Sequence, residues 1–309
     1  MNETTRKENA PITLTFLSTG SVRVRQSLKS QPMSNHSVLM RRLRSLTDCQ
    51  WSEALPIGLF VMHHLDGPIL FDTGDSPLWN TPGYHSILSV TKFVSHVTIG
   101  PEDGVLSQVR AHGIDPTTLQ AIVLSHLHGD HTGGLKDLAE AAPHVPFYVS
   151  REHWEAFGEH QTYAKTQGCT PQHWPEGFAP KMLQFEDCAV GPWKQSAKVT
   201  ADGQILAVPT PGHVPGHISL VVFSHEHEAT SATTPTTTTT YFLAADATYV
   251  IDLLDKEEPD GINDDPMTAL QSIRMIKEFS RERDVVVLPS HDPNTPRLLR
   301  DRVVYKPAS

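Results

Sequence analysis

Four potential metal ligands lie within six residues of the segment LSHLHGDHTGG (residues 124–134): His126, His128, Asp130 and His131. Imidazole and carboxylate groups bind zinc and other divalent first-row metals. In an approximately extended segment, side chains two residues apart lie on the same side, so His126 and His128 can bind one ion. The following turn would present Asp130 and His131 to a second ion. The chain has 18 histidines, and some clustering is expected, but this cluster follows an apolar strand expected at 119–124.

The composition indicates an ordinary globular protein, since the 309 residues are 38% hydrophobic and 19% charged. A net charge of -10 disfavours a nucleic-acid partner, because phosphate binding requires clustered Lys and Arg. We interpret the basic run at residues 40–44 as a solvated face or a helix surface. The widely spaced Cys49, Cys169 and Cys188 lack a C-x-x-C motif, which argues against a disulfide framework and against thiolate metal ligands.

The N-terminal sequence is polar and lacks an apolar stretch of signal-peptide length. No segment approaches the roughly 18 apolar residues of a membrane span. We therefore expect a cytoplasmic protein with no membrane partner. Residues 1–10 are expected to form a disordered arm, and residues 11–309 a single domain.

Apolar runs and turn signals predict an α/β chain. Strands are expected at residues 12–18, 57–63, 68–72, 119–124, 146–149, 205–209, 218–223, 241–245 and 285–288. Helices are expected at 101–113, 133–142 and 151–158, and after the capping pair Asp265-Pro266. The segment before residue 50 shows no clear periodicity, and residues 75–100 resemble an irregular flap. Functional residues are expected where strands end.

Residues 225–240 end in a threonine-rich, low-complexity run that we interpret as the disordered tip of a hairpin. His225 and His227 form a second H-x-H there, but as part of a surface turn without further partners. The pair His63-His64 is interpreted as a strand end.

Three further segments offer single ligands where strands give way to loops. His213 follows Pro211-Gly212, which would turn it inward, while Asp246 and His291 end two later strands. With the first cluster they make seven ligands, a number that suits two ions sharing one carboxylate.

This set resembles the metallo-β-lactamase superfamily, whose pattern is H-x-H-x-D-H followed by a lone His, a lone Asp and a lone His. The FDTG segment at residues 71–74 resembles the acidic motif that buttresses the metal loop in that family. The resemblance covers roughly residues 12–295. It implies an αββα sandwich of two mixed β-sheets flanked by helices, with the metals at one edge.

Within the superfamily, the chain is most similar to the N-acyl homoserine lactonases. The D-x-x-Y from Asp246 to Tyr249, the stretch TPGHVPGHISL (residues 210–220) and the pair His291-Asp292 carry this likeness. It implies that His126, His128 and His213 bind one metal, that Asp130, His131 and His291 bind the other, and that Asp246 bridges both. The threonine-rich insertion, the long segment before residue 57 and Ser290 in place of a common Gly depart from the group, and they bear on the substrate pocket and on oligomeric contacts.

The implied cofactors are two divalent ions, with zinc expected, although His and Asp ligands also accept manganese, cobalt or iron. The implied chemistry is attack on a lactone carbonyl by a metal-bridging hydroxide. Asp130 would pass a proton to the leaving oxygen, and Tyr249 would hydrogen-bond the carbonyl or the amide of the substrate. The alternative for Tyr249 is a packed core tyrosine. The predicted function is thus a quorum-quenching lactonase acting on a small-molecule lactone.

Two alternatives stay open. A glyoxalase II-like thioesterase uses the same seven ligands, but needs basic residues for the glutathione carboxylate, which the sequence does not identify. A persulfide-dioxygenase-like oxidoreductase needs one iron and only the first site, so Asp130 and His131 together argue against it. Five apolar residues could line a channel for an acyl tail or could equally pack in the core or the flap: Trp79, Tyr84, Ile87, Leu88 and Phe93.

Overall fold

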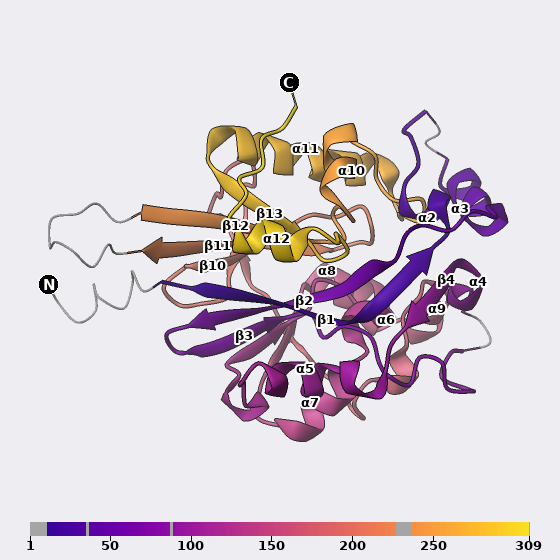
Figure 1. Ribbon diagram of the computed structural model, residues 1–309, viewed down its shortest axis with the longest axis horizontal. Helices are drawn as coiled ribbons and strands as arrows, with labels where there is room; N and C mark the ends of the chain where they lie inside the picture. The colour runs from indigo at the N-terminus through magenta and orange to yellow at the C-terminus, as the bar shows by residue number, and fades with distance from the viewer. Residues whose placement is uncertain (1–10, 35–36, 87–88, 227–236, 309) are drawn as a thin grey trace, which may run out of the picture.

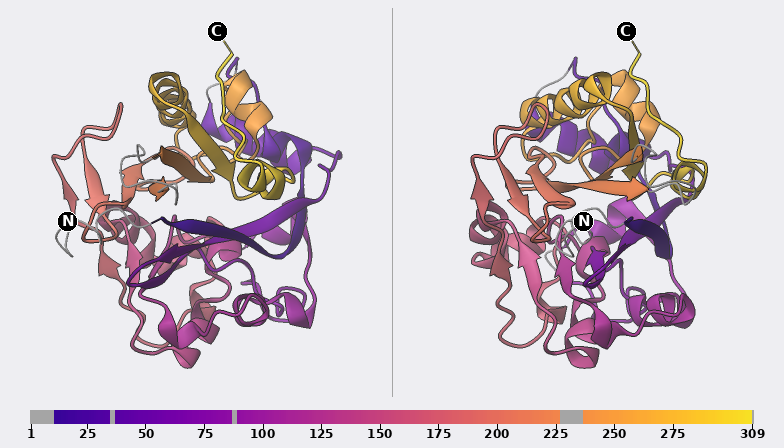
Figure 2. Two further views of the ribbon diagram at one scale, coloured as in Figure 1. Left: turned by 60° about the vertical axis from the view of Figure 1, so that its left-hand side comes forward. Right: turned by 90° about the vertical axis from the view of Figure 1, so that its left-hand side faces the viewer.

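Two β-sheets pack face to face, with helices on the outer face of each (Figures 1 and 2). The computed structural model describes residues 11–308, apart from 35–36, 87–88 and 227–236. The first sheet has the order β4-β1-β2-β3-β5-β6-β7 and the second β13-β12-β11-β10-β9-β8. Both contain parallel and antiparallel pairs. The predicted arrangement of two mixed sheets flanked by helices is therefore confirmed.

The first sheet comprises β1 (Thr13–Val24), β2 (Leu55–His64), β3 (Gly67–Phe71), β4 (Ser95–Thr98), β5 (Ala121–Val123), β6 (Phe147–Val149) and β7 (Lys181–Met182). The second comprises β8 (Phe185–Glu186), β9 (Ser196–Lys198), β10 (Ile205–Pro209), β11 (Ile218–Glu226), β12 (Thr237–Ala245) and β13 (Val285–Pro289).

The α-helices are α2 (Gln26–Lys29), α3 (Val38–Thr47), α4 (Thr91–Val94), α5 (Val105–Ala111), α6 (Gly129–Thr132), α7 (Leu135–Ala141), α8 (Arg151–His153), α9 (Gln161–Thr166), α10 (Ile251–Lys256), α11 (Pro266–Glu282) and α12 (Thr295–Arg300). Short 3-10 turns occupy Pro101–Asp103, Pro116–Thr118 and Pro171–His173, and a π-helical turn occupies Trp154–Gly158. Among the described residues, no helix has the length and apolar character needed to cross a membrane.

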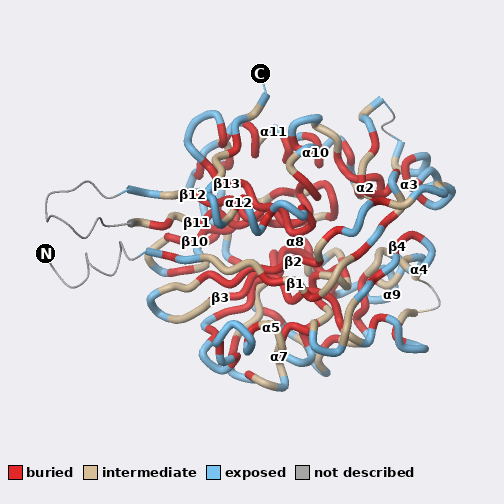
Figure 3. The backbone as a smooth tube through the Cα atoms, viewed as in Figure 1, coloured by how far each residue is buried: buried red, intermediate tan, exposed pale blue. Residues whose placement is uncertain are grey.

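Strand alternation divides the core into layers. On β2, Phe60 and Met62 point between the sheets, whereas Leu59 and Val61 belong to the cluster under α5 and α7. On the other side of the molecule, Phe242 of β12 packs with residues of α11. The central strands β2, β5, β10 and β13 are thus largely buried on both faces, and red tube fills the middle of the molecule in Figure 3.

Parallel pairing places the ends of strands at one edge. β3 pairs in parallel with β5, and β12 pairs in parallel with β13, so the loops after the two strands of each pair leave on the same side. β10 also ends there, because it runs alongside β12 on the other side of antiparallel β11. The segments that carry the predicted ligands follow β5, β10, β12 and β13, so the topology brings them together.

The segment before residue 50 contains a helix that sequence periodicity did not reveal. The apolar residues of α3 face outward: Leu39, Met40 and Leu43 are exposed, whereas Arg41 and Ser45 are buried. Arg41 donates to the carbonyl oxygens of four residues in two other segments: Gln31, Pro32, Pro259 and Asp260. The basic run lies on a helix, as one of its two interpretations expected, but the solvated face is wrong for Arg41, because a guanidinium with several carbonyl partners can be buried.

Residues 75–100 are not simply an irregular flap. They include α4 and β4, and β4 extends the first sheet by pairing with β1. Trp79 and Tyr84 are buried.

The loop predicted at residues 225–240 is too wide. Strand β11 continues to Glu226 and β12 begins at Thr237, and His225 pairs with Thr238 across the two strands. Residues 227–236, which include His227, lie outside the described residues, as do residues 1–10.

We expect Asp265→Ala to destabilise the protein by about 1 kcal/mol, because Asp265 accepts the N–H groups of Met267 and Thr268 at the start of α11. Chemical denaturation at fixed metal content measures this change. Asp265→Asn keeps the acceptor and should retain most of the stability. An Asp265→Ala protein as stable as the wild type would show that the cap does not stabilise α11.

Candidate metal centre

The seven predicted ligands converge at the edge where the strands end. The nitrogens of His126, His128 and His213 form one group within 4.8 Å of one another. His128 Nδ1 lies 3.0 Å from both His126 Nε2 and His213 Nε2. A turn with Gly212 at φ 129 brings His213 inward, and a Cβ on that glycine would meet the backbone of Ala269 at 2.1 Å.

A second group contains Asp130, His131 and His291. His131 Nε2 lies 3.9 Å from Asp130 Oδ1, and His291 Nε2 lies 3.7 Å from Asp130 Oδ2. Both histidines are buried, whereas the Asp130 side chain is 31% exposed. Asp130 is thus the most exposed of the seven ligand candidates.

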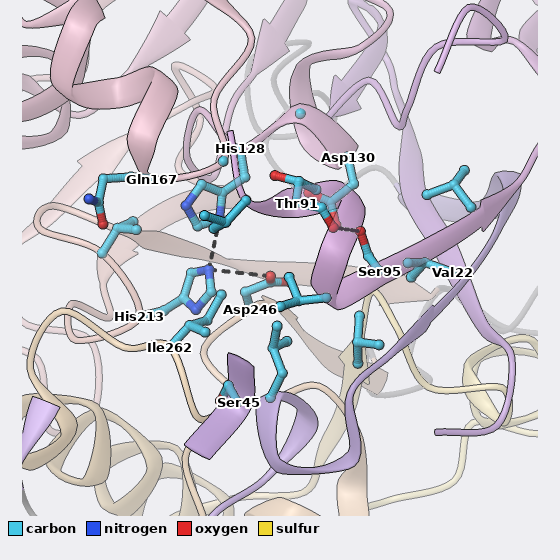
Figure 4. Close-up of a pocket in the computed structure, with 18 of the residues that line it drawn as sticks. Val22, Ser45, Thr91, Ser95, His128, Asp130, Gln167, His213, Asp246 and Ile262 are labelled. Atoms are coloured by element: carbon cyan, nitrogen blue, oxygen red, sulfur yellow. Dashed lines mark hydrogen bonds and ion pairs between the residues drawn. The ribbon is translucent and has the colours of Figure 1, made fainter. Parts of the chain in front are cut away.

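Asp246 lies between the two groups. Its Oδ2 is 3.5 Å from His213 Nε2 and 3.9 Å from His126 Nε2. Its Oδ1 is 3.3 Å from His131 Nε2 and 3.1 Å from His291 Nε2. Each carboxylate oxygen therefore faces a different histidine group, which is the geometry of a bridging ligand. Figure 4 shows Asp246 together with His213 and His128.

Hydrogen bonds on the far side of the rings fix which nitrogen faces the centre. His291 Nδ1 donates to Pro56 O at 2.8 Å, and His213 Nδ1 donates to Asp260 Oδ2 at 2.9 Å. Each of these rings is left with Nε2 as the nitrogen that can bind a metal. Such partners orient metal-binding imidazoles and raise their basicity.

Asp72, at the end of β3, connects the first metal loop to the second histidine group. It accepts the N–H of Ser125 at 2.7 Å, the hydroxyl of Ser125 at 2.8 Å and Nδ1 of His131 at 2.8 Å. Because Ser125 gives its hydroxyl proton to Asp72, its oxygen accepts from His126 Nδ1 at 2.9 Å. Asp72 adopts φ 64, a conformation that Asp tolerates better than most residues.

Two buried histidines that the sequence did not assign support the backbone of the site. His153 Nε2 accepts the N–H of Leu127, which lies between two ligands, at 2.9 Å. His217 Nε2 accepts the N–H of Asp246 at 3.2 Å. Their Nδ1 atoms face the carbonyl oxygens of Pro215 and Thr210. Burial lowers the pKa of His153 to about 4, so the ring stays neutral and keeps its acceptor nitrogen.

The donor set fits divalent metal ions. Burial lowers the pKa values of His126 and His128 well below their usual range, which leaves both rings in the neutral form that binds metals. His131 Nε2 and Asp246 Oδ1 are buried, and neither atom has a hydrogen-bond partner among the described residues. Buried polar atoms without partners are rare in folded proteins unless a ligand or ion satisfies them.

A cavity of about 210 Å³ opens onto this centre (Figure 4). Of the residues that could line a channel, Trp79 lines this cavity. Tyr84 and Phe93 do not line it, because Tyr84 stacks on His173 and Phe93 is 70% exposed. Ile87 and Leu88 lie outside the described residues. Most of the apolar wall comes from segments that the sequence did not implicate, and includes Val22, Val24, Leu28, Val94, Val97 and Ile262.

Tyr249 also lines the cavity, and its ring contacts both histidine groups. Its centroid is 6.0 Å from that of His213 and 5.2 Å from that of His291. Burial raises the pKa of Tyr249 well above its usual value, so the hydroxyl keeps its proton. The Tyr249 hydroxyl makes no hydrogen bond to a described residue, so it is available to a ligand.

Asp72→Asn should weaken metal binding about 10–100-fold, because an amide is a weaker, uncharged acceptor for the His131 Nδ1–H that the Asp72 carboxylate now holds. Competition with a chelator of known affinity measures this change. Asp66→Asn, in the exposed turn between β2 and β3, serves as the control and should bind metal like the wild type. Equal affinities in all three proteins would mean that Asp72 does not tune the centre.

Comparison with known proteins is consistent with this geometry. The model of the metallo-beta-lactamase superfamily matches residues 59–230, more than half of the chain. The N-acyl homoserine lactonase AiiA of Bacillus thuringiensis subsp. kurstaki is 28% identical over 240 residues, which cover 77% of this chain and 82% of that protein. The N-acyl homoserine lactonase AttM of Rhizobium radiobacter is 25% identical over 249 residues, covering 78% and 83%.

Solved structures support the same fold. An N-acyl homoserine lactone hydrolase with N-hexanoyl-L-homoserine at its catalytic metal centre aligns with a TM-score of 0.66 and 22% identity, covering 93% of this chain and 96% of that one. The dizinc quorum-quenching lactonase AidC aligns with a TM-score of 0.58 and 14% identity, covering 92% and 90%. Together with the family match, these likenesses show that the chain belongs to the metallo-beta-lactamase superfamily.

Proposed function

We propose that this protein is a dinuclear metal-dependent hydrolase that opens lactone rings, with N-acyl homoserine lactones as the favoured substrates. The observation that carries the proposal is the position of Asp246, with one oxygen toward each histidine group. Relatives that are N-acyl homoserine lactonases, at 25–28% identity, support the substrate class. Zinc is the expected metal, since AidC is a dizinc lactonase.

The proposed ligand sets are His126, His128 and His213 for one ion and Asp130, His131 and His291 for the other, with Asp246 shared. Two divalent ions bound there would activate a water molecule for attack and polarise the lactone carbonyl. Hydrogen bonds from His131, His213 and His291 to Asp72, Asp260 and Pro56 orient these rings and raise their basicity as ligands.

Tyr249 and Asp130 supply the remaining chemistry in this proposal. The Tyr249 hydroxyl donates a hydrogen bond to the carbonyl oxygen, or to the carbonyl of the substrate amide, and stabilises the negative charge that develops during attack. Asp130 takes the proton released by the attacking water and delivers it to the ring oxygen as the ester bond breaks. Its partial exposure and its place in the cavity wall suit that role.

The cavity wall argues against the glyoxalase II-like alternative. Among the described lining residues, the one Lys or Arg side chain is that of Arg42, and its Nη2 pairs with Asp264 Oδ1 at 2.5 Å. The carboxyl groups of Asp75 and Asp264 also line the wall. An anionic thioester such as S-lactoylglutathione would therefore meet a single cationic side chain among the described lining residues, that of Arg42, which already pairs with a carboxylate.

A panel of lactones, assayed by acid release with the zinc-loaded protein, tests the proposal, with S-lactoylglutathione as the thioester control. We expect ring opening of N-acyl homoserine lactones at rates that depend on tail length, because the cavity wall is largely apolar. Thioester cleavage with inert lactones would contradict the proposal and favour the thioesterase.

Tyr249→Phe should lower kcat for lactone opening about 10–1,000-fold while both metals stay bound, because it removes one donor to the developing negative charge. Steady-state kinetics and metal analysis by mass spectrometry measure the two effects. The Val250→Ala protein, altered at the next residue, controls for local repacking. Unchanged turnover in Tyr249→Phe would remove this residue from the mechanism and leave it as a packed core tyrosine.

A further inference from the structure

Exposed apolar side chains gather on α3 and at the neighbouring α4. Six of the ten large apolar residues that are exposed in the described part of the chain lie there: Leu39, Met40, Leu43, Leu46, Val90 and Phe93. Leu39 is 75% exposed and Phe93 is 70% exposed. The two helices contact each other, and both lie at the same end of the molecule in Figure 1. We call these six side chains the α3–α4 patch.

The sequence of α3 turns its apolar side chains outward. Leu39, Leu43 and Leu46 recur at the spacing of one helix face. The opposite face carries Arg41 and Ser45, which are buried against the rest of the protein. The apolar face of a helix normally packs on the core, and a contiguous exposed patch of this kind marks a surface that another molecule covers.

The α3–α4 patch borders the cavity that leads to the metal centre. Leu46 and Val90 line that cavity, although each is nearly half exposed. The same wall includes the buried side chains of Leu28, Val94 and Val97. The apolar surface is therefore continuous from the outside of α3 into the cavity. A molecule that covers the patch also meets the mouth of the cavity.

The segments that carry the patch are basic, although the chain as a whole has a net charge of -10. Residues 23–47 contain no Asp or Glu, and neither do residues 76–100. Their Lys and Arg residues are Arg23, Arg25, Lys29, Arg41, Arg42, Arg44 and Lys92. Arg44 and Lys92 are exposed, each is next to a patch residue in the sequence, and neither forms an ion pair with a described residue. The charge of this surface therefore suits an anionic partner.

An anionic lipid bilayer matches both the apolar side chains and the charge. Leu, Met and Phe side chains enter the boundary between headgroups and acyl chains, while nearby Lys and Arg attract anionic headgroups. A second copy of this chain is disfavoured, because a two-fold interface would place the same basic side chains opposite each other. The expectation of no membrane partner rested on the absence of a spanning segment, which a surface contact does not require.

We propose that the α3–α4 patch docks the mouth of the cavity on the surface of an anionic lipid bilayer. An apolar lactone dissolved in that bilayer then enters the cavity from the membrane side, with its tail along the apolar wall. Docking itself needs no substrate, and only the entry of the lactone rests on the proposed lactonase function.

Sedimentation of the metal-loaded full chain with lipid vesicles, in the absence of substrate, tests the docking. We expect binding to vesicles of phosphatidylcholine mixed with phosphatidylglycerol, and weaker binding to phosphatidylcholine alone or at high salt. Leu39→Ser combined with Phe93→Ser should lower the partition coefficient about tenfold, because both side chains leave water on docking. Arg44→Gln and Lys92→Gln should each lower it about fivefold, for the anionic vesicles only.

Leu65→Ser is the matched control, since it removes an exposed leucine from the turn between β2 and β3 and should bind vesicles like the wild type. A short-tailed, water-soluble lactone should open at the same rate in all of these proteins, because the altered residues do not line the cavity. A long-tailed lactone held in anionic vesicles should open more slowly in the protein that lacks Leu39 and Phe93.

Absence of binding to anionic vesicles, or equal binding by the wild type and the patch variants, overturns the inference and leaves the lactonase function standing. Self-association in solution that the patch variants abolish, without vesicle binding, also overturns it and makes the patch an interface between copies of this chain. Vesicle binding that depends on the patch, in a protein that opens no lactone, supports the docking and overturns the lactonase function.

Discussion

The two oxygens of Asp246 face different groups of histidines, and the rest of the structure serves to hold this carboxylate between them. Asp246 directly follows Ala245, the last residue of β12. Ala245 adopts φ 45, an unfavourable conformation for alanine. The N–H of Asp246 is held by His217. Local backbone strain of this kind persists where surrounding contacts over-determine the conformation, and it concentrates at functional sites. The parallel neighbour β13 delivers His291 to the same edge.

Segments far from the metal loops fix the orientation of the ligands. Asp260 orients His213, and Arg41 of α3 binds the carbonyl oxygens of Pro259 and Asp260. Pro56, at the start of β2, orients His291. The N-terminal segment therefore supports the site from outside, in addition to forming the apolar wall of the cavity. This dual role explains why cavity-lining and stabilising residues are interleaved along residues 22–46.

Much of the centre was predictable because its signals are local. The H-x-H-x-D-H cluster needs no distant information, and the single ligands His213, Asp246 and His291 each follow an apolar strand. Apolar runs bounded by turn signals likewise predicted most strands of both sheets. What sequence patterns could not supply depends on tertiary contacts. The apolar residues of α3 face outward and its arginine inward, which inverts the usual amphipathic signal. His153 and Asp260 act only through partners distant in sequence, so nothing near them marks their role. The short strands β7 to β9 are recognisable only by their pairing.

The central claim is that two metal ions, held by seven ligands that include the shared Asp246, open a lactone ring. The most direct test is a titration of metal-free protein with zinc, in which bound metal and hydrolysis of an N-acyl homoserine lactone are followed together. The proposed mechanism predicts two ions bound per chain, with full activity only after the second site fills. Activity that saturates at one ion per chain, or activity that requires a single iron ion, would contradict the dinuclear mechanism and favour the mononuclear oxidoreductase.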